Sequence, residues 1–175
     1  DTNLYLRFEY FITNLFTSIK QISNVKIVIK LHPGQDEYSK LMIMLFKKFN
    51  LDVEIHHLTP IIDLLSKCDI LVNISPESFD TSTVILESLI MKIPTINVIL
   101  DDQNYHFSFV KDDAVLTISD KSNLDENLNK ILFDKKTREN LQTSGEKHLL
   151  NYLSNPGSAS FSLVEYVETL ITENE

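Results

Sequence analysis

The 175-residue chain has one cysteine, three glycines and no tryptophan. A single cysteine, Cys68, excludes an intrachain disulfide framework and is typical of a reducing compartment. Its position between a helical and a strand-like segment indicates buried filler rather than a nucleophile. The chain also lacks any apolar run near the roughly 18 residues of a membrane span, and lacks a recognisable signal peptide. We therefore expect a cytoplasmic protein.

Basic residues are scarce relative to acidic ones. The chain has 16 Lys and Arg against 25 Asp and Glu, for a formal net charge of −9. Nucleic-acid binders need a basic face that displaces counterions, so nucleic acid is excluded as a partner. An anionic membrane surface is disfavoured as a direct partner for the same reason.

The apolar residues are present in ordinary amount, 43% of the chain, which is enough for one compact domain spanning 1–175. The sequence starts at Asp1, without Met and already inside a helical pattern, so we expect a fragment of a longer protein.

Hydrophobic periodicity predicts alternating helices and strands. Helices are expected at 3–22, 41–49, 60–67, 81–91, 122–133, 135–152 and 158–172, and strands at 25–31, 51–56, 69–74, 94–100 and 114–118. Thr59-Pro60 is typical of an N-cap followed by proline at the first helical position. This alternation predicts an α/β fold: a Rossmann-like parallel sheet with helices on both faces and a helical C-terminus.

Polar residues follow each of the first four predicted strands. In an open parallel sheet, ligands bind beyond the carboxyl ends of the strands, so we expect these loops to share one edge. They are His32-Pro33-Gly34, His56-His57-Leu58-Thr59, the stretch from Ser75 to Thr83, and Asp101 to Asn104.

The stretch "SPESFDTST" leads directly into the predicted helix 81–91. One of its last four residues, Asp80 to Thr83, is expected to cap that helix. Free N–H groups at the helix start, together with hydroxyls of Thr81, Ser82 and Thr83, suit a phosphate group. Glu87 lies one turn after Thr83, where its carboxylate can accept hydrogen bonds from a ribose diol. A plain helix cap with a solvated Glu87 accounts for the same pattern about equally well.

His32 is held by its neighbours. Pro33 restricts the preceding residue to extended conformations, and Gly34 permits a sharp turn. The imidazole is then placed to hydrogen-bond a phosphate or to protonate a leaving oxygen. A turn histidine without a ligand remains the slightly better reading of the spacing alone.

Other chemistries lack their signatures. No GxGxxG or GxxxxGK[ST] motif supports a dinucleotide or P-loop site, and no GxSxG elbow supports a hydrolase triad. Adjacent His56 and His57 seldom ligate one ion together, so no metal is expected. The stripe of Phe161, Val164, Val167, Leu170 and Ile171 reads as a packing face.

Two motifs in order, "VIKLHPG" and then "DLLSKCDILVNISPESFDTSTVILESLIMKIPTINV", resemble the carboxyl-terminal, donor-binding half of GT-B-fold transferases. The nearest types are capsule and surface-polysaccharide glycosyltransferases, sialyltransferase-like enzymes and CDP-glycerol glycerophosphotransferases. The resemblance covers roughly residues 25–100.

The resemblance implies a role for each motif. His32 would contact the donor phosphate or assist the leaving nucleotide, Ser82 and Thr83 would bind phosphates, and Glu87 the ribose. The segment from His57 through Leu58 and Thr59 to Pro60 would face the base. The substrate would be a nucleotide-activated sugar or glycerol, with no cofactor, and the acceptor a surface glycan at the inner membrane face.

The resemblance also implies what this chain lacks. The amino-terminal acceptor domain, which supplies the usual general base, has no counterpart here, so the chain alone is expected to be inactive. The helix at 158–172 would have lost part of its natural contact, and its apolar strip would favour self-association.

Two other readings stay open. UDP-N-acetylglucosamine 2-epimerases share the architecture, but their phosphate loop usually reads Ser-Gly-Gly, unlike Asp80 to Thr83. A non-catalytic Rossmann-like interaction domain would use the same polar residues only as caps and turns. A receiver-type signalling domain is disfavoured, because His32 stands where an acidic cluster would end the first strand.

Overall fold

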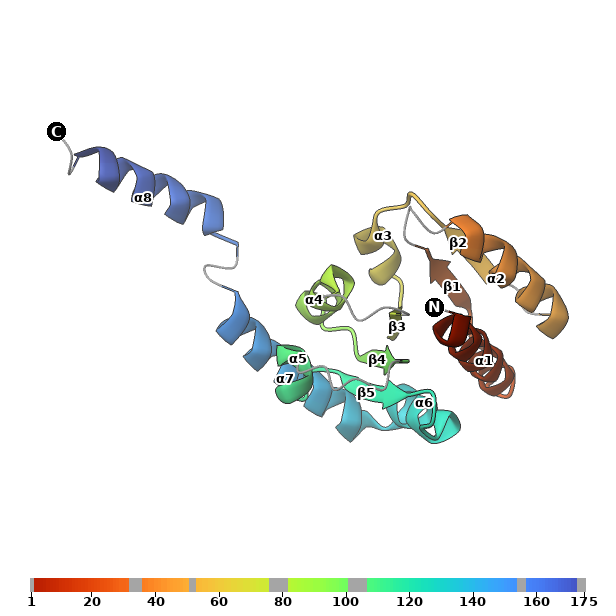
Figure 1. Ribbon diagram of the computed structural model, residues 1–175. Coiled ribbons are helices and arrows are strands. Elements are labelled where there is room, and N and C mark those ends of the chain that lie inside the picture. The colour runs from red at the N-terminus through yellow and green to blue at the C-terminus, as the bar shows by residue number, and fades with distance from the viewer. Residues whose placement is uncertain are drawn as a thin grey trace.

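The computed structural model describes residues 2–31, 36–50, 53–75, 82–100, 107–153 and 157–172. Helices and strands alternate through most of this chain, and three helices close it (Figure 1). The helices are α1 (Thr2–Ile19), α2 (Asp36–Phe49), α3 (Ile61–Leu65), α4 (Thr83–Ile90), α5 (Ser108–Lys111), α6 (Leu124–Phe133), α7 (Lys135–Tyr152) and α8 (Ala159–Thr172). The strands are β1 (Ile27–Lys30), β2 (Val53–His56), β3 (Leu71–Ser75), β4 (Thr95–Ile99) and β5 (Leu116–Ser119).

All pairings between these strands are parallel, which confirms the predicted α/β class. β1 pairs with β2, with Lys30 opposite His56, and β4 lies between β3 and β5, with Asn97 opposite both Asn73 and Thr117. Among the described residues the strands form a two-stranded and a three-stranded sheet rather than one continuous sheet.

One apolar core nevertheless joins the two sheets. Buried side chains of α1, among them Phe11 and Phe16, pack with Ile96 and Val98 of β4 and with Ile131 of α6, and Ile29 and Ile55 of the smaller sheet pack against them. The periodicity of α1 predicts this buried stripe correctly.

The other face of β3, β4 and β5 is covered by α4 and α5. Because strand side chains alternate, Asn73, Asn97 and Thr117 share a face with Thr95. Thr95 hydrogen-bonds Ser88 of α4 at 2.7 Å, and Phe109 of α5 joins Ile85 and Leu89 in a second apolar cluster on this side. α1 and α4 lie on opposite sides of β3 in Figure 1.

Boundaries differ from the predictions by at most three residues, apart from the start of α2, and α5 was not predicted. α2 begins five residues earlier than the stripe at 41–49 indicates, because its first turn is polar. Pro60 occupies the N-cap position of α3 rather than its first helical position. Thr59 does not act as the predicted cap, since its hydroxyl lies 3.0 Å from Nδ1 of His56. None of the helices in the described ranges is long and apolar enough to cross a bilayer.

Candidate functional site

The turn that follows β2 is tied to the end of β1 by Lys30. The Lys30 ammonium donates to the carbonyl oxygens of Leu31 at 2.9 Å and His57 at 2.5 Å. Both acceptors are neutral carbonyl groups, and the ammonium lies at the point where β1 ends. Lys30 was not predicted as a site residue, because a lysine at a strand end is usually an ordinary solvated side chain. Its place directly before Leu31-His32-Pro33 was the available signal.

Side chains within this turn also bond one another. The second ring nitrogen of His56, Nε2, lies 3.5 Å from Glu54, which forms a 2.6 Å ion pair with Lys26. Hydrogen bonding to Lys26, with a smaller contribution from His56, lowers the pKa of the Glu54 carboxyl below its usual value. These bonds hold the turn together. Leu58 lies on this turn and has 85% of its surface exposed. Of the three residues predicted here, His57 and Thr59 are half-buried and only Leu58 is fully open.

The start of α4 is joined to the sheet through Ser82. Ser82 occupies the N-cap position, as the cap prediction allowed, but its side chain makes no capping hydrogen bond. Its hydroxyl instead donates to Oδ1 of Asn73 at 3.3 Å, and Asn73 donates to Asn97 at 3.1 Å. The chain of bonds runs from the helix start across two strands. Neither asparagine was predicted, although two polar residues inside apolar strands were a visible signal.

Thr83 and Glu87 lie on a different side of α4 from the residues that face the sheet. Ile85, Ser88 and Leu89 are the buried residues of the helix, whereas Thr83 is exposed. Glu87, four residues later, is half-buried, and its Oε2 is shielded from solvent without a hydrogen-bond partner among the described residues. A shielded carboxylate oxygen costs free energy unless something donates to it. Thr83 and Glu87 therefore share one side of α4, and Oε2 of Glu87 has no hydrogen-bond donor within the described ranges.

The remaining predicted residues cannot be placed. His32, Pro33, Gly34 and Thr81 lie outside the described residues. Ser75 ends β3, opposite Ile99 of β4, but its side chain is also outside them. The predicted convergence of His32 with the hydroxyls at 82 and 83 thus stays a prediction.

A second polar pair, unforeseen in the sequence, joins α7 to α5. His148 is 1% exposed, and its Nδ1 lies 2.7 Å from the carboxylate of Asp112. The ring stacks on Tyr152 with centroids 5.4 Å apart. The two residues are 36 positions apart, so no local pattern could reveal them. Because it reaches across the packed side of two helices, this pair serves to hold α5 against α7.

An open polar groove of about 510 Å³ lies between α1 and the turn after β5. Its lining includes Tyr10, Asn14 and Asp125, and Asp120 at its edge is held by a two-pronged ion pair with Arg7 at 2.8 Å. The groove involves none of the predicted site residues.

Two further chemistries can be assessed directly. In the part of the chain that the structure describes, no three His, Cys, Asp or Glu side chains lie close enough to hold a metal ion. Burial, with a smaller effect of Asp69, raises the pKa of the Cys68 thiol, and its Sγ lies 3.2 Å from the Leu64 carbonyl. A thiol with a raised pKa is a poor nucleophile, but Cys68 is half-buried rather than fully buried as predicted.

Comparison of the chain with models of protein families, with curated proteins and with solved structures found no match in any of the three.

Proposed function

We propose that this chain is the donor-binding domain of a GT-B-type glycosyltransferase or glycerophosphotransferase that acts in surface-glycan synthesis. The observation that carries the proposal is the face of α4 formed by Thr83 and Glu87, directly after β3. It combines a helix start, an exposed hydroxyl and a shielded carboxylate oxygen that has no donor in the part of the chain that the structure describes. Those groups suit the phosphate and the ribose of one nucleotide.

The phosphate would be bound at the first turn of α4. The amide groups of Thr83 and Val84 belong to the helix start, where backbone donors have no intrahelical partner, and the helix dipole favours an anion there. Thr83 adds a hydroxyl donor. Ser82 contributes differently: its proton is directed to Asn73, so it fixes the helix start on β3 rather than donating to the ligand.

Charge would be supplied from the other sheet. Lys30 holds a positive charge at the end of β1, beside the turn with Leu58. A preorganised cation of this kind stabilises the charge that develops on a leaving nucleotide, and His32 would protonate that oxygen or bind the phosphate. Leu58, exposed on its internally bonded turn, would contact the base. No cofactor is needed, since the nucleotide-activated sugar or glycerol is itself the substrate.

The proposal places the chain in the cytoplasm, at the inner membrane face where a glycan acceptor is anchored. A separate acceptor domain would supply the general base, as in the GT-B resemblance. The Rossmann-like half alone is then a binding domain without turnover.

Nucleotide binding tests the proposal. We expect CMP, CDP, UDP or GDP at millimolar concentration to raise the melting temperature of the chain. Thr83→Val and Glu87→Gln should each weaken binding about tenfold or more, because each removes a hydrogen bond to a charged or shielded group. His32→Ala should weaken it as well. Thr143→Val and Glu139→Gln, the same changes on the exposed side of α7, are the matched controls.

The alternatives predict other outcomes. A melting temperature that does not change with any of these nucleotides would favour an interaction domain. Binding restricted to UDP, with epimerisation by the full-length protein, would favour the 2-epimerase reading.

A further inference from the structure

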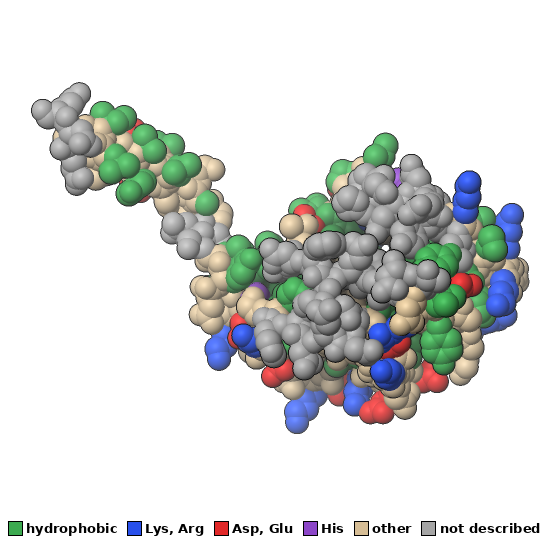
Figure 2. All heavy atoms as spheres, in the orientation of Figure 1, with side chains coloured by type: hydrophobic (Ala, Val, Ile, Leu, Met, Phe, Trp, Pro, Cys, Tyr) green, Lys and Arg blue, Asp and Glu red, His purple; other side chains and the backbone are tan. Residues whose placement is uncertain are grey.

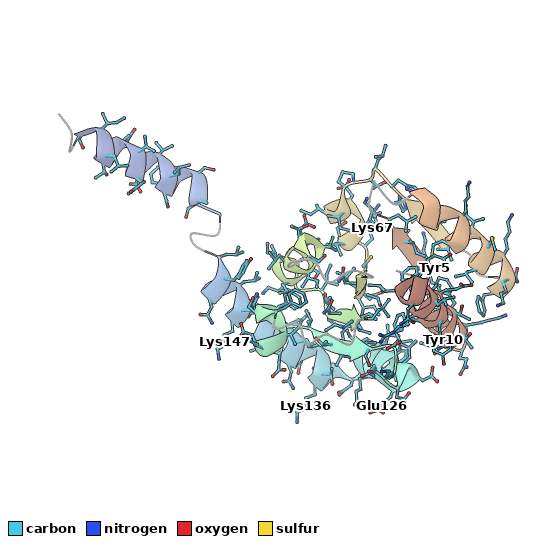
Figure 3. The ribbon with its side chains drawn as sticks, in the orientation of Figure 1. Tyr5, Tyr10, Lys67, Glu126, Lys136 and Lys147 are labelled. Atoms are coloured by element: carbon cyan, nitrogen blue, oxygen red, sulfur yellow. The ribbon has the colours of Figure 1, made fainter. Side chains whose placement is uncertain are left out.

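α8 carries an apolar side that nothing in the described chain covers. Figure 1 shows the helix projecting from the body, and Figure 3 shows its side chains reaching into open space. No residue of α8 is buried. Six large apolar side chains are between 45% and 66% exposed: Phe161, Leu163, Val164, Tyr166, Val167 and Ile171. They form the patch of apolar atoms that marks α8 in Figure 2.

Most apolar residues of α8 lie on one side of the helix and most polar residues on the other. At 3.6 residues per turn, Leu163, Tyr166 and Val167 lie next to one another, with Val164 and Ile171 along the same side. The opposite side carries Ser162, Glu165 and Thr169, with Glu168 and Phe161 beside them. Such a division is expected of a helix that packs by one side onto a partner.

An uncovered helix of this length is unfavourable in water. Isolated helices shorter than about 12–15 residues are marginal, and α8 has 14. Contiguous exposed apolar surface is also rare in monomers and marks an interaction site. A partner that covered the apolar side of α8 would remove both of these costs.

Charge selects among the possible partners. Residues 157–172 contain no Lys or Arg, and their two charged side chains, Glu165 and Glu168, are acidic. Helices that lie on anionic membranes carry basic residues on their polar side, so a membrane surface is a poor partner. Another α8 is a good one, because both glutamates lie away from the middle of the apolar side and are not brought together when two such sides meet.

The area of the apolar side of α8 also suits a second copy of this chain as the partner. Covering the five side chains of that apolar side would bury on the order of 500 Å² per copy, which is below the roughly 800 Å² per partner of a standard interface and is the size of a weak, reversible association. A self-complementary patch on one helix is also what a two-fold dimer requires.

We propose that α8 is a self-association surface and that its apolar side packs on α8 of a second copy of this chain. The inference does not depend on nucleotide binding. It rests on the exposure, the sidedness and the charge of one helix.

Sedimentation velocity of the 175-residue chain over a wide range of concentration tests it. We expect a reversible monomer–dimer equilibrium. Val167→Asp should raise the dissociation constant at least about tenfold, because it buries a charge in the interface. Thr169→Asp adds the same charge to the polar side and should leave the constant unchanged. Far-UV circular dichroism of both variants shows whether the body stays folded, which the lack of buried residues in α8 predicts.

Several outcomes would overturn the proposal. One is a chain that stays monomeric at every concentration, with the α8 amides protected from hydrogen exchange by the chain's own body. Another is an equal effect of the two Asp variants. Pelleting of the chain with phosphatidylglycerol vesicles and no dimer would assign the apolar side to a membrane instead.

Discussion

The two faces of the three-stranded sheet have different compositions and different tasks. One presents Ile96, Val98 and Ile118 to α1 and α6. The other presents Asn73, Asn97 and Thr117 to the side that α4 covers, and Asn73 reaches the start of that helix through Ser82. Burial of apolar groups stabilises without direction, whereas hydrogen bonds have geometry. We conclude that the first face provides stability and the second fixes the position of the candidate site.

The largest expected effect is on the apolar face. Ile96 is fully buried, so Ile96→Ala should lower the free energy of unfolding by about 3 kcal/mol through lost burial and an unfilled cavity. Urea unfolding measures it. Ile90→Ala, at a residue of α4 that is 56% exposed, is the control and should change little. Equal losses at the two positions would break the distinction between buried face and surface.

A smaller effect is expected on the polar face. Asn97→Leu leaves Nδ2 of Asn73 without its acceptor and should cost about 2 kcal/mol. The double variant with Asn73→Leu should cost less than the sum of the two single changes, because the two side chains share one bond. Strictly additive costs would contradict the hydrogen-bonded chain from Asn97 to Ser82.

The smallest expected effect is on the pH dependence of the melting temperature. It comes from exposed carboxylates that lie away from both faces of the sheet. Hydrogen bonds to Lys26, Lys130 and Thr137 lower the pKa values of Glu54, Glu126 and Asp134, respectively. A lowered pKa in the folded state gives stability that is present above the unfolded pKa and is lost as pH falls through the folded one. Melting temperature should therefore decline slightly below about pH 4.5, and Glu126→Gln should flatten that decline. A rise in melting temperature on acidification would contradict these pairings.

The fold was predictable where pattern and packing agree. The stripe of α1 and the β-branched runs of β1 and β4 specify their elements, because burial rewards the same periodicity that the sequence shows. The division into two sheets was not predictable, since which strands pair depends on how distant segments pack, and the composition of each strand does not show that. α5, with four residues, is too short to show a period.

The candidate site was predictable only where it is local. Thr83 and Glu87 are four residues apart, so helical spacing alone places them on one side. The Ser82–Asn73 bond and the Lys30–His57 bond join residues 9 and 27 positions apart. Such contacts are set by how strands and helices pack. The spacing of residues along the sequence does not show which of these residues meet. The pairs His148–Asp112 and Arg7–Asp120 are more distant still, at 36 and 113 positions apart.

The most direct test of the nucleotide site is a titration of the isotopically labelled chain with CDP or UDP, followed by the amide resonances in NMR. The account predicts saturable shifts concentrated at the amides of Thr83, Val84 and Glu87, with smaller shifts around Lys30 and Leu58, and loss of these shifts in Glu87→Gln. Shifts confined to other surfaces, such as the groove beside Tyr10, or no saturable shift at all, would contradict it.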